Sequence, residues 1–256
     1  MAPPRNPVVV IPARLAATRF PDKPLADLLG EPMIVHVWRR AVAADVGPVV
    51  VACGDAAIAD AIRAAGGNAV MTDPNLASGS DRVHQAVERI DPDGAHDAVI
   101  NVQGDLPTVE PEIIAAALAP LAEPGVDIAT LAAVITEPRE RTDPNVVKAV
   151  LALAPGATTG RALYFSRAAV PSGEGTLYHH IGLYAFRRTA LARFVALPES
   201  TLERRERLEQ LRALEAGMRI DAALVDTVPL GVDTPADLAR ARSILLDGAP
   251  NAETSR

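Results

Sequence analysis

The chain has 256 residues, of which 49% are hydrophobic and 22% are charged, a globular composition that excludes wholesale disorder. The length allows one large α/β domain or two small ones. The formal net charge of −7 gives no indication of the basic face that a nucleic-acid backbone requires. A single cysteine, Cys53, excludes an internal disulfide framework and a multi-cysteine metal site. Since no apolar run approaches 18 residues, we expect no signal peptide, no membrane span and a cytoplasmic protein.

The first half of the chain alternates short apolar runs with helical patterns. We expect buried strands at Val8–Pro12, Val49–Cys53, Ala69–Thr72 and Ala98–Val102, and helices near Pro32–Ala44, Asp55–Ala65 and Ser78–Ile90. This alternation predicts βαβ units and a parallel sheet that is covered by helices on both faces.

The second half is less regular. We expect strands at Val126–Ile135, Val146–Leu153, Ala162–Phe165 and Leu183–Phe186, helices at Leu202–Ala216 and Asp233–Leu246, and a frayed tail at Asn251–Arg256. Because no low-complexity linker separates the halves, the sequence predicts a single domain over residues 1–256 with an inserted β-rich lobe.

Three cations follow the first predicted strand: Arg14, Arg19 and Lys23 lie within ten residues. Loops at the carboxyl ends of strands bind ligands in open α/β sheets, and spaced cations suit a triphosphate. Lys23 and Lys148 are the only lysines among 25 basic residues, which hints that a compact ammonium is required. The alternative is a solvated cationic loop.

Two aspartates are candidate metal ligands. Asp105 follows Gly104 at the end of a predicted strand, and Asp233 precedes a Thr-Pro helix start. Mg²⁺ prefers one or two carboxylates together with substrate oxygens. The alternatives are a turn aspartate at position 105 and a helix cap at position 233.

Longer motifs carry a family resemblance. The stretches are IPARLAATRFPDKPL, GEPMIVHVWRRA, SGSDR, NVQGD, DPNVVK, ALYFSRA, HHIGLYAFRR, LERRERLEQLRALEAG and GVDTPADL. In order and spacing they resemble the 3-deoxy-manno-octulosonate (Kdo) cytidylyltransferase family over nearly the whole chain. The resemblance implies a Rossmann-like nucleotide-diphospho-sugar transferase fold with a mostly parallel mixed sheet. It also implies a Mg²⁺-dependent, homodimeric enzyme that transfers CMP from CTP to an acidic sugar and releases pyrophosphate.

The resemblance further implies roles for individual residues. Residues of about 8–125 would form the nucleotide-binding half and those of about 126–246 the acceptor-binding and dimerisation half. The CTP phosphates would be bound by Arg14, Arg19 and Lys23, which would act in catalysis with Asp105. The cytidine end would be held by Ser78, Gly79 and Arg82, and Mg²⁺ by Asp105 and Asp233. The acceptor pocket would comprise Gln103, Arg167, His180, Tyr184, Glu209 and Gln210.

Several of these residues have structural alternatives. Ser78 would cap a helix together with Asp81, Tyr184 and His180 would be core residues, and the polar side chains at 209 and 210 would be solvent-exposed on an amphipathic helix.

Leu106 and His179 depart from the family pattern, which has an acidic residue at the first position and Lys or Arg at the second. Two other hypotheses therefore stay open. One is a cytidylyltransferase for a different 2-keto acid sugar or small acid such as a phosphonate, and the other is a catalytically idle nucleotide-binding homologue.

Overall fold

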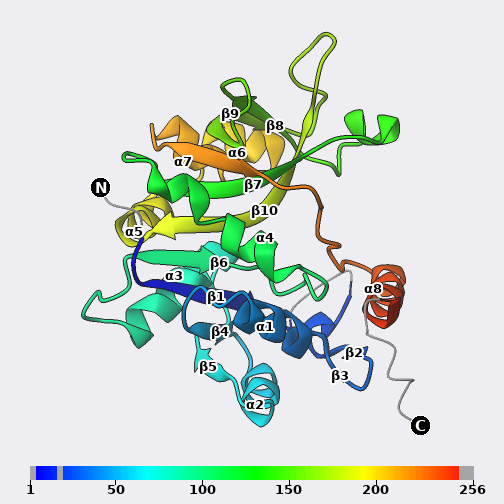
Figure 1. The fold of residues 1–256 in the computed structure, drawn as a ribbon. Coiled ribbons are helices and arrows are strands. Elements are labelled where there is room, and N and C mark those ends of the chain that lie inside the picture. The colour runs from blue at the N-terminus through cyan, green and yellow to red at the C-terminus, as the bar shows by residue number, and fades with distance from the viewer. Residues whose placement is uncertain (1–3, 16–19, 248–256) are drawn as a thin grey trace.

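The computed structural model describes residues 4–15 and 20–247, which form a mixed sheet of nine strands flanked by helices (Figure 1). The strand order is β5-β4-β1-β6-β10-β7-β11-β9-β8. The strands are β1 (Pro7–Ala13), β4 (Val49–Cys53), β5 (Asn68–Met71), β6 (Ala98–Asn101), β7 (Ile128–Val134), β8 (Lys148–Ala152), β9 (Thr159–Ser166), β10 (Tyr178–Arg187) and β11 (Ile220–Leu224), with a separate two-stranded sheet of β2 (Asp27–Leu28) and β3 (Glu31–Pro32).

The helices are α1 (Met33–Ala43), α2 (Ala56–Ala64), α3 (Gly79–Ile90), α4 (Pro111–Ala116), α5 (Arg188–Ala196), α6 (Thr201–Glu206), α7 (Leu211–Glu215) and α8 (Pro235–Asp247), with short 3₁₀ turns η1 (Lys23–Leu25), η2 (Ala119–Ala122) and η3 (Pro138–Arg141). No helix of the described ranges is long and apolar enough to cross a membrane.

The predicted parallel half is confirmed. Strand β1 lies between β4 and β6, and β5 pairs with β4, all in parallel. All four central residues of β1, Val8–Ile11, are fully buried, as expected for a strand with helices on both faces. Consequently the carboxyl ends of β1 and β6 open at the same edge of the sheet.

The predicted β-rich lobe is a closed ring of strand pairings. Strand β7 pairs with β11, β11 with β9, β9 with β8, and β8 pairs back onto the first residues of β10, which itself pairs with β7. The other end of β10 pairs antiparallel with β6. The long strand β10 therefore joins the lobe to the parallel half, and one irregularity between Ile181 and Tyr184 shifts its register on β7.

The predicted helix at 202–216 is wrong in one respect. It is two short helices, because Arg207 adopts a left-handed conformation (φ 55°) that ends α6. The turn directs Glu209 and Gln210 inward. Helices α4 and α5 and strand β11 were not predicted, and the tail predicted at 251–256 lies outside the described residues.

Helix α8 lies beside the β2–β3 hairpin, far along the chain from it (Figure 1). Val232 and Ala241 pack there against Leu28 and Met33, and all four side chains are fully buried. This contact brings the segment before α8 next to Lys23, the first residue of η1.

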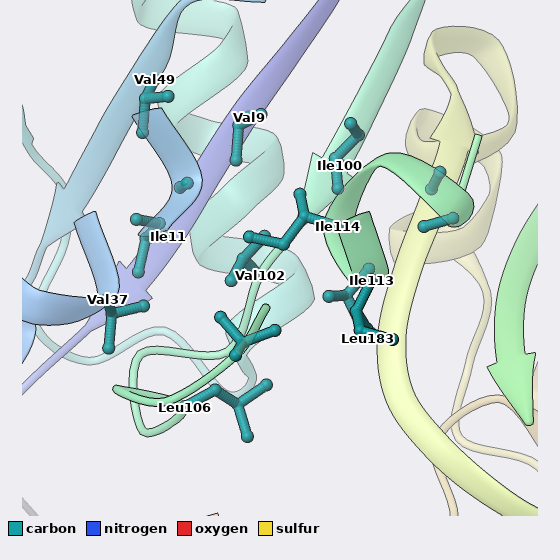
Figure 2. Close-up of a cluster of buried hydrophobic side chains, with 14 of the residues drawn as sticks. Val9, Ile11, Val37, Val49, Ile100, Val102, Leu106, Ile113, Ile114 and Leu183 are labelled. Atoms are coloured by element: carbon teal, nitrogen blue, oxygen red, sulfur yellow. The ribbon is translucent and has the colours of Figure 1, made fainter. Parts of the chain in front are cut away.

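Leu106 belongs to the main hydrophobic cluster between the sheet and helices α1 and α4 (Figure 2). Its side chain is only 8% exposed and lies among other cluster members such as Ile113 and Leu183. The leucine at this position is thus a core residue, and burial of its apolar surface contributes about 1.5–3 kcal/mol to stability.

Lys148 is fully buried, yet its ammonium is satisfied by three backbone carbonyls. Nζ donates to the oxygens of Asp143 and Val146 at 2.7 Å and of Arg167 at 3.1 Å. Burial lowers the pKa of this amine, and the nearby Asp143 raises it. Lys148 is therefore a structural residue that links β8 to the loop after β9.

Replacing Lys148 by Met should lower the free energy of unfolding by about 2–4 kcal/mol, since three buried carbonyls lose their donor. Urea denaturation measures this loss. Arg139→Met, an exposed cation of η3, is the control and should change stability by less than about 0.5 kcal/mol. A Lys148→Met protein as stable as the control would contradict the structural assignment.

Candidate active site

Lys23 joins three segments that are far apart in sequence. Its Nζ donates to Asp105 Oδ2 at 2.8 Å, to the carbonyl oxygen of Val232 at 2.8 Å and to Asp233 Oδ1 at 3.3 Å. The lysine side chain is 16% exposed, whereas those of Asp105 and Asp233 are 32% and 49% exposed. Both aspartates predicted as metal ligands thus converge on one cationic position at the carboxyl edge of the parallel sheet.

Gly104 allows the Asp105 loop to approach the end of β1. A Cβ at this position would lie 2.7 Å from the carbonyl oxygen of Pro12, closer than a side chain tolerates. The loop is held from the other side, where the Val232 amide donates to the Asp105 carbonyl at 2.9 Å. Backbone contacts therefore fix where the Asp105 carboxylate points.

Asp233 is not the cap of α8, contrary to the alternative considered from the sequence. Thr234 fills that role: its Oγ1 accepts from the Asp237 amide at 3.2 Å, and Asp237 accepts from the Thr234 amide at 3.0 Å. The Asp233 carboxylate is thereby left to face Lys23.

A cavity of about 120 Å³ lies beside this cluster. It is lined by Pro12, Ala13, Arg14, Ser78, Gly79, Arg82 and Gln103. Four of these residues were predicted to bind the nucleotide, so the structure brings that set together. Gln103, predicted for the acceptor pocket, also lies here, and its Nε2 donates to Asn101 Oδ1 at 3.2 Å.

Arg82 is 2% exposed and holds the loop after β5. Its guanidinium donates to Thr72 Oγ1, to the Asp73 carbonyl at 3.1 Å and to the Pro74 carbonyl at 3.3 Å. Burial, and next the positive charge of Arg14, lower its pKa. Ser78 forms the predicted capping box with Asp81 at the start of α3, so this cavity wall is rigid.

A second cavity, of about 10 Å³, has room for one water-sized group and is lined by three predicted acceptor residues, Tyr184, Glu209 and Gln210, together with Ser80. Glu209 Oε1 and Gln210 Nε2 are buried there without a hydrogen-bond partner. Burial, and to a lesser extent Glu209, raise the pKa of the Tyr184 hydroxyl, which stays protonated. Unpartnered buried polar atoms are rare in folded proteins, so a water molecule or a hydroxyl group of a ligand would complete their hydrogen bonding.

His180 lies next to this cavity as a neutral imidazole. Its ring centroid is 5.6 Å from that of Tyr184, and Nε2 is 3.0 Å from Thr130 Oγ1. Because Thr130 also faces two carbonyl oxygens, its own proton goes to one of them and Nε2–H donates to the hydroxyl. Burial, aided by His179, lowers the pKa of His180 to about 3.

Arg167 is not among the residues that line either cavity. Its guanidinium donates to the carbonyls of Glu206 at 2.9 Å, Pro144 at 3.0 Å and Arg207 at 3.4 Å. It fastens the turn between α6 and α7 to the loop before β8. Arg19 lies outside the described residues.

Three functional features had no obvious sequence signal. Thr130 orients His180 from inside an apolar strand, the Val232 carbonyl binds Lys23, and Ser80 reaches Glu209 Oε2 at 2.8 Å. Of these three, only Ser80 could have been suggested from the sequence, because it lies next to the predicted site residue Gly79 at the start of a predicted helix. Cys53 is fully buried, and burial raises its thiol pKa to about 12, as expected of a core cysteine.

Comparisons with known proteins define the class. A family model described as cytidylyltransferase matches residues 8–220. The structure of CMP:2-keto-3-deoxy-manno-octonic acid synthetase complexed with CTP matches with a TM-score of 0.88 and 37% identity, over 96% of this chain and all of that one. A nucleotidyl transferase from Methanothermobacter matches with a TM-score of 0.63 at 15% identity, which supports the fold alone. The fold is that of a cytidylyltransferase.

Curated relatives narrow the class further. The 3-deoxy-manno-octulosonate cytidylyltransferase of Rhodospirillum centenum is 72% identical over 95% of both chains, and that of Paramagnetospirillum magneticum is 68% identical over 94% of this chain and 98% of the relative. The chain belongs to the 3-deoxy-manno-octulosonate cytidylyltransferase family, as the sequence motifs predicted.

His180 should make stability pH-dependent. Its folded pKa of about 3 lies below its ordinary value of 6.5, so the unfolded chain binds a proton that the native protein excludes. The free energy of unfolding therefore falls as the pH drops below 6.5, by about 1.4 kcal/mol per pH unit near pH 5.

His180→Gln keeps a donor for Thr130 and removes the titration. Urea denaturation between pH 7 and pH 4.5 gives the free energy of unfolding at each pH. Near pH 5 this free energy should fall less steeply in the variant than in the unmodified protein, by about 1.4 kcal/mol per pH unit. Parallel profiles would contradict a neutral, buried His180.

Proposed function

We propose that this chain transfers CMP from CTP to the anomeric hydroxyl of Kdo, giving CMP-Kdo and pyrophosphate. The observation that carries the proposal is the convergence of Lys23, Asp105 and Asp233 beside the nucleotide cavity. The family membership and the CTP complex of the 37% identical relative support the same reaction.

The reaction needs charge neutralisation more than covalent chemistry by the protein. The acceptor oxygen attacks the α-phosphorus, and the bond between the α-phosphorus and the oxygen that bridges to the β-phosphate breaks. Pyrophosphate leaves with the electron pair of that bond, and the hydroxyl proton goes to solvent. Arg14 and Lys23, with Arg19, would bind the phosphates. Lys23 is suited to the leaving pyrophosphate because an ammonium on a flexible stem follows moving oxygens.

Asp105 and Asp233 fit a Mg²⁺ ion. Their carboxylates already face one cation, the Lys23 ammonium, within 3.3 Å. Mg²⁺ commonly takes one or two carboxylates and completes its shell with phosphate oxygens and water. Bound there, the ion would polarise the phosphate.

The unpartnered atoms of the second cavity support a polyhydroxylated acceptor. Glu209 Oε1 accepts and Gln210 Nε2 donates, so together they can bind one hydroxyl group of the acceptor, which donates to the first atom and accepts from the second. We propose that Tyr184 and His180 complete this wall. Arg167 would act in the pocket by holding the α6–α7 turn, and Gln103 would face the boundary between nucleotide and acceptor.

Neither departure from the family pattern lies in this cavity. Leu106 is packed in the core, and His179 lines a different cavity of about 480 Å³ between η3 and α8, with Nδ1 3.9 Å from Glu140 Oε2. This placement favours Kdo over another acceptor.

The family resemblance also leads us to propose a cytoplasmic homodimer. Val228 and Ile244 border the 480 Å³ cavity and are 43% and 47% exposed, an apolar area that a second copy would cover. Sedimentation analysis would give the mass in solution, and a monomer at micromolar concentration would contradict this part of the proposal.

Pyrophosphate release with CTP and Mg²⁺ tests the function, using Kdo and a panel of other 2-keto acid sugars and phosphonates. Release with Kdo is expected. Turnover of another acid alone would keep the reaction and change the acceptor, whereas CTP binding without turnover of any acceptor would indicate an idle homologue.

Lys23→Ala should lower kcat by about two to three orders of magnitude, because it removes charge stabilisation of the leaving group. Asp105→Asn should abolish Mg²⁺-dependent turnover. Lys23→Arg keeps the charge without the compact ammonium and should retain partial activity. Thermal melts check that each variant folds, and a fully active Lys23→Ala enzyme would contradict the assigned role.

A further inference from the structure

We propose that Ser80 is a positioning residue for the acceptor: it holds one carboxylate oxygen of Glu209, so that the other oxygen faces an acceptor hydroxyl. The inference rests on the proposed function, since it takes the acceptor to be a polyhydroxylated acid. It adds to the site a residue of the nucleotide-binding half that serves the second substrate.

The first turn of α3 faces two cavities. Gly79 and Arg82, three residues apart and on one side of the helix, line the cavity of about 120 Å³. Ser80 is rotated by about 100° from Gly79 and lines the second cavity instead. The capping box of Ser78 and Asp81 fixes the turn that carries all of them.

Ser80 Oγ donates to Glu209 Oε2 at 2.8 Å, and the serine is 4% exposed. The hydroxyl has one proton, and this bond uses it. Glu209 precedes α7 in the turn after Arg207, and a glutamate has three side-chain torsions. The serine therefore selects one orientation of a side chain that the turn alone would leave free to rotate.

The remaining atoms are complementary to hydroxyl groups. Glu209 Oε1 and Gln210 Nε2 are both buried without a partner and belong to the same cavity. The cavity of about 10 Å³ has room for one such group, and a single acceptor hydroxyl can donate to Oε1 and accept from Nε2. Because Ser80 binds Oε2, the Glu209 carboxylate is held in one orientation and Oε1 can accept a hydrogen bond from a hydroxyl group of the acceptor.

The charged and titratable groups around Glu209 are Arg212, Tyr184 and, near Arg212, Asp81. Arg212 is bound to Glu203 through both Nε and a terminal nitrogen. None of these side chains makes a hydrogen bond to Glu209 in the described structure, and Ser80 supplies the one that is present.

Ser80→Ala, Ser80→Thr and Ser80→Cys test the proposal, with Ser243→Ala on the exposed face of α8 as the matched control. Steady-state kinetics gives KM for Kdo and for CTP, and calorimetry gives the Kd of Kdo with a non-hydrolysable CTP analogue present.

Ser80→Ala should raise the Kd and KM for Kdo by about tenfold, the loss expected for one hydrogen bond to a charged group, and leave KM for CTP within about twofold. Ser80→Thr should restore affinity, Ser80→Cys should be intermediate, and Ser243→Ala should behave as the unmodified protein. Ser80→Ala combined with Glu209→Gln should bind Kdo no worse than Glu209→Gln alone.

Equal changes in both KM values, or unchanged Kdo affinity in Ser80→Ala, would overturn the proposal. If Ser80→Ala does not fold, unchanged affinity in Ser80→Cys has the same meaning. Failure of the proposed function is distinguishable, because the unmodified protein itself would then not turn over Kdo.

Discussion

The contact of Lys23 with Asp105, Val232 and Asp233 is the constraint on which the rest of the site depends. It joins a 3₁₀ turn after β1, a loop after β6 and the segment before α8. Each carboxylate faces the same ammonium, and Gln103, two residues before Asp105, lines the cavity of about 120 Å³. Without this cation the two carboxylates would repel each other at the sheet edge. In the proposed reaction, phosphates would bind Lys23 and Mg²⁺ would bind the two carboxylates.

The two lysines show how differently one residue type is used in the same chain. Lys148 is fully buried and bound to three carbonyls, whereas Lys23 is partly exposed and bound to two carboxylates. Backbone carbonyls carry no net charge and move little, so the first lysine is a fixed tie. Carboxylates at an open edge can exchange partners, so the second is available for a substrate.

The candidate site contains two kinds of groups: side chains that are held by hydrogen bonds within the protein, and buried polar atoms that have no hydrogen-bond partner. Ser78, Arg82 and Thr130 make hydrogen bonds within the protein. Glu209 and Gln210 each keep one buried polar atom without a partner. Such atoms destabilise the free protein, which agrees with the proposal that an acceptor hydroxyl completes their hydrogen bonding.

The sequence by itself determined the parallel half and the family, because strand periodicity, Pro and Gly positions and motif spacing are local properties. It also identified Lys23 and both aspartates as candidates for the site. It did not determine the break at Arg207, the cap at Thr234 or the role of Leu106. Tertiary structure decided these. Arg207 adopts a left-handed conformation, which is uncommon for arginine and is not predicted from its residue type. Thr234, and not Asp233, caps α8. The meeting of Lys23 with Asp105 and Asp233 was likewise decided by tertiary structure, because packing of α8 against the β2–β3 hairpin brings together residues that are 210 positions apart.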